Sequence, residues 1–79
     1  MAQKGESMGE RFRRLREEAR LTQDEAAERS GIPLGTLRHW EQGHTQPRLS
    51  QAVKLARTLG VDMNTLTGFG EETRRRGKK

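Results

Sequence analysis

Residues 21–43, LTQDEAAERSGIPLGTLRHWEQG, decide the fold of this chain. Thr22 and Glu25 have the S/T-x-x-E spacing of a capping box, in which each side chain accepts a hydrogen bond from the backbone N–H of the other residue. This arrangement predicts a helix over residues 23–30, and Gly31 stands where a left-handed residue ends a helix. The stretch therefore begins with one short helix, and the sequence predicts both its start and its end.

A second helix follows after a very short link. Pro33 suits a first helical turn because its φ is fixed, and the helix is expected to span residues 33–42 with Gly43 as its stop. A link of only Gly31, Ile32 and Pro33 is typical of a helix-turn-helix, although an αα-corner used for packing has the same pattern. In a helix-turn-helix, the two helices cross steeply, and the start of the second helix projects from the surface, where it can enter a DNA major groove.

Apolar residues at helical spacing predict three further helices around this pair. The first precedes residue 21, the second spans residues 49–59, and the third is a short helix between Asp62 and Gly68. No segment alternates polar and apolar residues in the manner of a strand. The predicted fold class is therefore all-α, a compact domain of five helices. The residues expected to face its core are Met8, Phe12, Leu15, Ala19, Ala26, Ala27, Ser30, Leu37, Trp40, Leu49, Ala52, Val53, Ala56, Leu59, Met63 and Leu66.

The length of 79 residues, 29% of them hydrophobic, allows one small domain. We expect a flexible N-terminus over residues 1–8, a folded domain over residues 9–68 and a disordered basic tail over residues 69–79. A folded part of about 60 residues is near the lower limit of unassisted stability, so a homodimer is a natural expectation.

The charge of the chain favours a polyanionic partner. Sixteen Lys and Arg residues against eleven Asp and Glu residues give a net charge of +5, with a pI near 10.7. The excess is concentrated in residues 29–57, with five basic residues and one acidic residue, and in residues 71–79, with five basic and two acidic residues. Nucleic acid would suit this balance, although a charged soluble surface can show the same bias.

Several kinds of chemistry find no support in the sequence. The absence of cysteine excludes disulfides, a thiol nucleophile and Cys-containing zinc sites. The serines, histidines and carboxylates form no nucleophile-and-base arrangement, so we expect no enzymatic activity and no cofactor. His39 and His44 are five residues apart, which matches no helical pair of metal ligands. Without a run of about 18 apolar residues or a secretory signal, the expected protein is soluble and cytoplasmic and has no membrane contact.

Short motifs in a fixed order carry a resemblance to a known family. They are Leu15-Arg16 in the first helix, the Leu-Thr-Gln-x-Glu-x-Ala run from Leu21 to Ala27, Gly31-Ile32 in the turn, and Trp40, Glu41 and Gly43 followed by Pro47. With these motifs, residues 9–68 resemble the Cro and phage-repressor type of helix-turn-helix domain, the XRE family. The resemblance implies a phage-repressor-like arrangement of five helices that binds double-stranded DNA.

The resemblance also implies individual DNA contacts. Leu34 and Gly35 lack hydrogen-bonding side chains. Base readout would therefore rest on Leu34 against a thymine methyl and on Arg38 and His39 as donors, with DNA shape contributing. Arg38 can bind guanine or a phosphate, His39 can equally be a solvated surface residue, and Gln23 can be a plain helix former. The implied base contacts are Leu34, Gly35, Thr36, Arg38 and His39, and the implied phosphate contacts are Thr22, Gln23, Gln42, His44, Thr45 and Arg48.

Two further positions concern stability. In the family, the positions of Arg16 and Glu41 hold a partly buried ion pair that orients the DNA-reading helix, although here they can also be two surface charges. Arg20 stands where relatives often have Gly, so a left-handed conformation there costs about 1 kcal/mol. Arg48 replaces the usual hydroxyl cap of the helix over residues 49–59 and weakens its start.

The function implied is a sequence-preferring, double-stranded-DNA-binding transcriptional regulator, expected to act as a homodimer on a two-fold site. The alternative is an antitoxin-type protein-binding module that neutralises a partner toxin and autoregulates its operon, since some antitoxins share this domain. RNA binding is less favoured, because the chain has only three aromatic residues and Trp40 is expected in the core.

Overall fold

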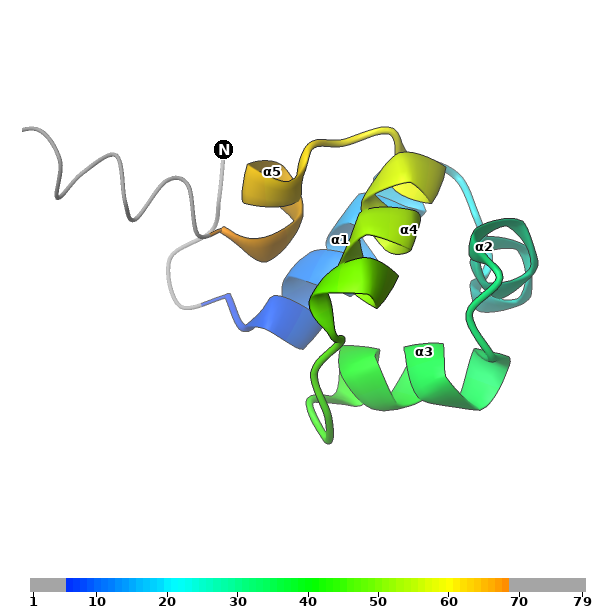
Figure 1. Cartoon of the computed structure of the whole chain (residues 1–79), viewed down its shortest axis with the longest axis horizontal. Helices are drawn as coiled ribbons and strands as arrows, with labels where there is room; N and C mark the ends of the chain where they lie inside the picture. The colour runs from blue at the N-terminus through cyan, green and yellow to red at the C-terminus, as the bar shows by residue number, and fades with distance from the viewer. Residues whose placement is uncertain (1–5, 69–79) are drawn as a thin grey trace, which may run out of the picture.

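The computed structural model describes residues 6–68, and this range consists of helices and loops (Figure 1). The helices are α1 Met8–Glu18, α2 Gln23–Ser30, α3 Leu34–Gln42, α4 Leu49–Leu59 and α5 Met63–Thr67. The predicted all-α fold with five helices is therefore confirmed. The proposed basic tail, residues 69–79, and residues 1–5 lie outside the described range.

Helix α1 begins at Met8, the last residue of the N-terminus that was expected to be flexible. The Ser7 hydroxyl accepts a hydrogen bond from the Glu10 N–H at 3.1 Å, and the Glu10 carboxylate accepts one from the Ser7 N–H at 2.9 Å. This is a second capping box of the kind found at Thr22, where the corresponding distances are 3.1 and 2.9 Å. The flexible N-terminus predicted over residues 1–8 thus includes, at its end, the cap and first residue of a helix.

The link between α2 and α3 is anchored as well as short. Gly31 adopts the left-handed conformation with φ 77°, and the N–H groups of Gly31 and Ile32 both donate to the Ala27 carbonyl, at 2.9 and 3.2 Å. The Ile32 side chain is buried in the core, which sequence periodicity did not indicate. In Figure 1, α2 is seen nearly end-on while α3 lies across the view, so the two helices cross steeply.

The core is built where all five helices meet. Helix α1 packs against α3 and α5, and α2 packs against α3 and α4. Trp40 is 2% exposed and meets the Phe12 ring edge-on, with 6.3 Å between ring centroids. Leu49, expected to be inward, is instead 73% exposed, because it is the first residue of α4 and lies beyond the buried face. Leu55 is the large residue that fills that face.

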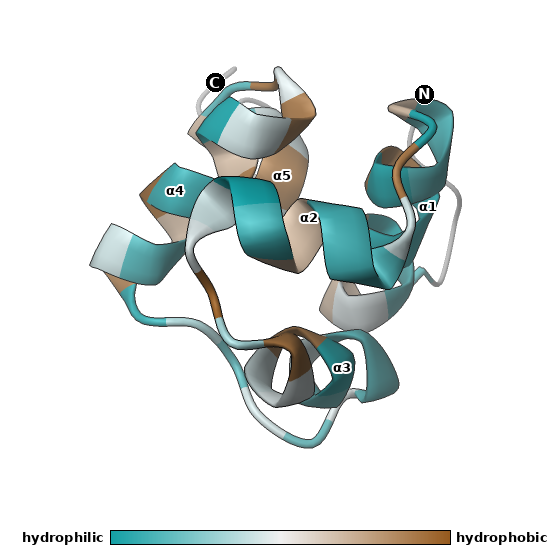
Figure 2. Ribbon diagram, turned by 90° about the vertical axis from the view of Figure 1, so that its right-hand side faces the viewer, coloured by the Kyte–Doolittle hydropathy of each residue, from teal (hydrophilic) through white to brown (hydrophobic). Residues whose placement is uncertain are grey.

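Gly9 allows α1 to approach α3 very closely. A Cβ atom at this position would lie 2.6 Å from the backbone oxygens of Trp40 and Glu41, which is shorter than any tolerable contact. The C-terminal end of α3 is therefore fixed against α1 by backbone proximity. In both Figure 1 and Figure 2, α3 lies at one edge of the bundle, with the other helices on one side of it only.

Candidate nucleic-acid interface

One side of α3 packs into the core and the other faces solvent. Leu37 and Trp40 are buried, whereas the predicted base contacts Gly35, Arg38 and His39 are exposed, and Leu34 and Thr36 are half-buried. A Cβ atom at Gly35 would have no neighbour within 4 Å, so packing does not require glycine at this position. The start of α3 is therefore open to a ligand approaching from outside.

The N-terminus of α2 opens into a shallow hollow of about 490 Å³. Its first two N–H groups, those of Gln23 and Asp24, have no intrahelical acceptor and carry the positive end of the helix dipole. The hollow brings together three of the predicted phosphate contacts from two separate helices. It is lined by Arg13, Arg16, Thr22, Gln23, Glu41 and Gln42.

Arg13 is a cation in this hollow that the sequence analysis did not assign to DNA. Its Nε donates to a Glu17 carboxylate oxygen at 3.2 Å, and the two side chains are 66% and 56% exposed. Such an exposed i,i+4 pair is weak, so Arg13 can exchange Glu17 for another anion. Only the folding of α1 against α3 brings it near Gln42, and no local motif indicates this.

The loop that follows α3 carries the remaining predicted phosphate contacts. His44, Thr45 and Arg48 are all exposed. The His44 N–H donates to the His39 carbonyl at 2.9 Å, and the two imidazole rings meet edge-on with 5.7 Å between centroids. His39 thereby connects the exposed face of α3 with this loop.

Arg48 precedes α4 as an incomplete cap. Its backbone N–H donates to the Gln51 side-chain oxygen at 3.0 Å, which is one half of a capping box. The Arg48 side chain has no acceptor atom, so it cannot supply the other half. Its guanidinium is left exposed instead of being used to start the helix.

A buried ion pair links α1 to the end of α3. Arg16 is 8% exposed, and its Nε and Nη2 donate to the two carboxylate oxygens of Glu41 at 2.7 and 3.2 Å. Its Nη1 donates to the Leu21 carbonyl at 2.8 Å, just before α2. Arg16 therefore connects three segments, and its positive charge compensates the Glu41 carboxylate near the C-terminal end of α3.

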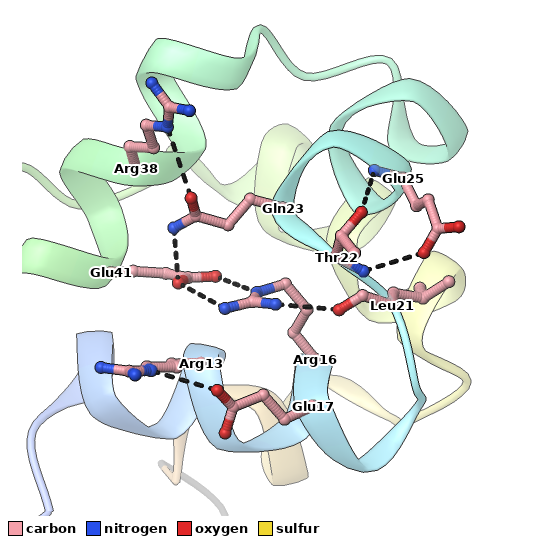
Figure 3. A network of polar contacts seen from close by, with 9 residues as sticks. All are labelled: Arg13, Arg16, Glu17, Leu21, Thr22, Gln23, Glu25, Arg38 and Glu41. Atoms are coloured by element: carbon pink, nitrogen blue, oxygen red, sulfur yellow. Dashed lines mark hydrogen bonds and ion pairs between the residues drawn. The ribbon is translucent and has the colours of Figure 1, made fainter.

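Gln23 extends this ion pair to the surface of α3, as Figure 3 shows. Its Nε2 donates to Glu41 Oε1 at 3.0 Å, and its Oε1 accepts a hydrogen bond from Arg38 Nε at 3.3 Å. The side chain predicted to contact phosphate thus also joins α2 to α3. Sequence reasoning missed this contact because Gln23 and Arg38 are 15 positions apart.

The electrostatics of the two well-capped helices follow from their hydrogen bonds. The Thr22 backbone N–H holds the pKa of Glu25 below its ordinary value, because it donates to the charged carboxylate. The Glu6 carboxylate, 2.7 Å from Arg14, raises the pKa of that guanidinium.

Within residues 6–68, no group of three or more His, Cys, Asp or Glu residues is placed to hold a metal ion. None of the helices in that range combines the length and apolarity of a membrane span.

Comparison with known proteins identifies the family. The helix-turn-helix family HTH_3 matches residues 12–66. An uncharacterised HTH-type transcriptional regulator, y4dJ of Sinorhizobium fredii (strain NBRC 101917 / NGR234), is 38% identical over 66 residues, which are 84% of this chain and 86% of that protein. The chain therefore belongs to the HTH_3 family of helix-turn-helix proteins, and the XRE-type resemblance of its motifs is confirmed.

A solved structure agrees with the fold. The crystal structure of an HTH_3 family transcriptional regulator from Vibrio cholerae matches 89% of this chain with a TM-score of 0.74 and 20% sequence identity. This chain spans 38% of the length of that protein, so the likeness concerns one part of a larger molecule.

Proposed function

We propose that the protein is a sequence-preferring transcriptional regulator that binds double-stranded DNA and places the start of α3 in the major groove. The observation that carries the proposal is the exposed face of α3, which adjoins both the hollow at the α2 N-terminus and the loop after α3. A major groove admits one helix, and flanking donors on both sides would hold it against the two phosphate backbones.

Base readout in this proposal depends on a few side chains. Leu34 would contact a thymine methyl group, and Arg38 and His39 would donate to base edges or to phosphate. Gly35 leaves room for a close approach of the DNA, because nothing on the protein side occupies the space of its missing side chain. The proposed base contacts are Leu34, Gly35, Thr36, Arg38 and His39.

Phosphate contacts would flank this face on both sides. At the hollow, free N–H groups and the Arg13 guanidinium meet an incoming phosphate, while the charge of Glu41 is compensated by Arg16. At the loop, exposed side chains on either side of Pro47 would hold the other strand. The proposed contacts are Arg13, Thr22, Gln23, Gln42, His44, Thr45 and Arg48.

We further propose a homodimer that occupies a two-fold symmetric operator and blocks or recruits polymerase. Two copies of α3 about 34 Å apart would meet successive turns of the same groove. The regulator would perform no catalysis and need no cofactor. It would bind its DNA in the cytoplasm.

Selection of bound fragments from random duplex DNA tests the proposal. We expect a two-fold symmetric motif, and an affinity that falls at least about a thousandfold between about 50 mM and 200 mM salt if six or more phosphates are neutralised. Arg38→Ala should weaken binding, whereas Arg57→Ala should not, because Arg57 lies in the last turn of α4, at the end remote from α3 (Figure 1).

Two results would contradict the proposal. One is binding that does not change with salt or that shows no preferred sequence. The other is a tight complex with a co-purified protein and no affinity for duplex DNA, the outcome that an antitoxin-type module without a DNA role would give.

A further inference from the structure

The amide of Gln23 has an orientation that its surroundings impose. Its Nε2 lies 3.0 Å from Glu41 Oε1, and a carboxylate oxygen can only accept, so the NH₂ group must face Glu41. The carbonyl oxygen is then turned the other way, where it accepts from Arg38 Nε at 3.3 Å. Glu41 is itself held by two hydrogen bonds from Arg16. A continuous chain of polar contacts thus runs from a buried arginine to an exposed one.

We propose that Gln23 is a positioning residue for Arg38, and that it fixes which edge of the guanidinium faces the DNA. This inference rests on the proposed DNA-binding function. A guanidinium has two edges that can make paired hydrogen bonds, one formed by Nε with an Nη atom and one formed by the two Nη atoms. Because Gln23 occupies Nε, the edge formed by the two Nη atoms remains for a ligand. Figure 3 shows these terminal nitrogens on the side of Arg38 away from Gln23.

The ligand chemistry implied is a pair of acceptor atoms side by side. Guanine offers O6 and N7 in the major groove, and a phosphate offers two oxygens. Because Gln23 already holds the exposed Arg38 side chain, Arg38 loses less rotamer freedom when it binds a ligand. The Gln23 contact therefore raises the affinity for that ligand without touching it. Gln23 keeps one further amide hydrogen, which can donate to a phosphate at the start of α2.

A double-mutant cycle in DNA affinity tests the coupling. The variants are Gln23→Met, which keeps the length of the side chain and removes both amide contacts, Arg38→Ala, and the combination of the two. The probe is the tightest duplex recovered from random DNA. We expect Gln23→Met to weaken binding about tenfold in the wild-type background and about threefold or less once Arg38 is absent, since only a phosphate contact is then lost.

Gln42→Ala serves as the matched control, because Gln42 lines the same hollow and has no hydrogen bond to Arg38 among the described residues. Its effect should add to that of Arg38→Ala within about twofold. A readout without DNA is the ¹⁵N–¹H signal of Arg38 Nε, whose exchange with water should be slowed in the wild type and become faster in Gln23→Met. Thermal melting identifies any variant that fails to fold, and Gln23→Ala then replaces Gln23→Met.

The outcomes separate this inference from the function on which it rests. If the wild type binds DNA and the effects of Gln23→Met and Arg38→Ala are additive, the positioning role is overturned and the DNA-binding function stands. If the wild type binds no duplex, both fall. If the effects are coupled, replacing guanines of the probe by 7-deazaguanine, which lacks N7, identifies the acceptor. If this replacement weakens binding only when both Gln23 and Arg38 are present, the acceptor is guanine. If it leaves the affinity unchanged, the acceptor is phosphate.

Discussion

Removal of the Arg16 side chain should cost this domain most of its stability. Arg16 makes two hydrogen bonds to Glu41 and one to the Leu21 carbonyl, and the Glu41 side chain is 4% exposed. In Arg16→Ala, the Gln23 amide is the one hydrogen-bond partner that the Glu41 carboxylate keeps among residues 6–68. Leaving one member of a buried ion pair without its partner costs about 3–5 kcal/mol of folding free energy. The total stability expected for some 60 residues is about 3–9 kcal/mol.

Thermal unfolding followed by circular dichroism measures this effect. At roughly 4–8 °C per kcal/mol, the melting temperature should fall by at least about 12 °C, or the cooperative transition should disappear. Arg13→Ala is the matched control, because its exposed pair with Glu17 contributes about 0.3–0.5 kcal/mol. The double variant Arg16→Met/Glu41→Leu should recover much of the loss, since it leaves no unpaired charge. Equal melting temperatures for Arg16→Ala and Arg13→Ala would refute the reasoning.

Three further outcomes follow from particular contacts. Gly9→Ala should lower the free energy of unfolding by about 1–3 kcal/mol, because the added methyl group would meet the backbone oxygen of Trp40 at 2.6 Å, and urea denaturation would measure the loss. The same substitution at Gly35 should stabilise the fold by up to about 1 kcal/mol, since its Cβ meets open space and alanine favours the helix, and should weaken DNA binding; unchanged affinity in a titration would exclude close approach at that position. The capping box at Thr22 should stabilise the fold less as pH falls. Folding lowers the pKa of Glu25 from its ordinary value of 4.5, so the Glu25 carboxylate contributes its full stability above about pH 4.5. This contribution disappears as pH falls through the pKa that Glu25 has in the folded protein. The difference in melting temperature between wild type and Glu25→Gln should therefore shrink from pH 7 to acid pH, and a constant difference would contradict this account.

Sequence reasoning was most successful where the signal is local. The capping box at Thr22 and the left-handed Gly31 predicted the bounds of α2, and Arg20 does adopt a left-handed conformation with φ 64°. The equally local signal at Ser7 and Glu10 was missed, because the preceding polar residues suggested an unstructured terminus. Leu49 shows the limit of periodicity, which gives the face of a helix but not how far along it the core extends.

The candidate interface required the tertiary structure. Nothing local in the sequence brings Arg13 toward Gln42, or Gln23 against Arg38, because these pairs depend on how α1 and α2 pack on α3. The close approach at Gly9 was also invisible, since a glycine inside a helix pattern shows nothing of its neighbours. The sequence therefore named most of the candidate contact residues, which stay predictions, whereas Arg13 and the contacts that orient these side chains emerged only from the fold.

The residues that hold α3 and the residues that would read DNA lie on different faces of one helix. Leu37 and Trp40 pack in the core, and Glu41 is bound by Arg16, so the orientation of the helix does not depend on Gly35 or His39. Under the proposed function, substitutions on the exposed face would change the preferred operator at little cost in stability. Arg38 is the exception, because Gln23 connects it to the buried ion pair, and any change there alters both the interface and the contact that orients it.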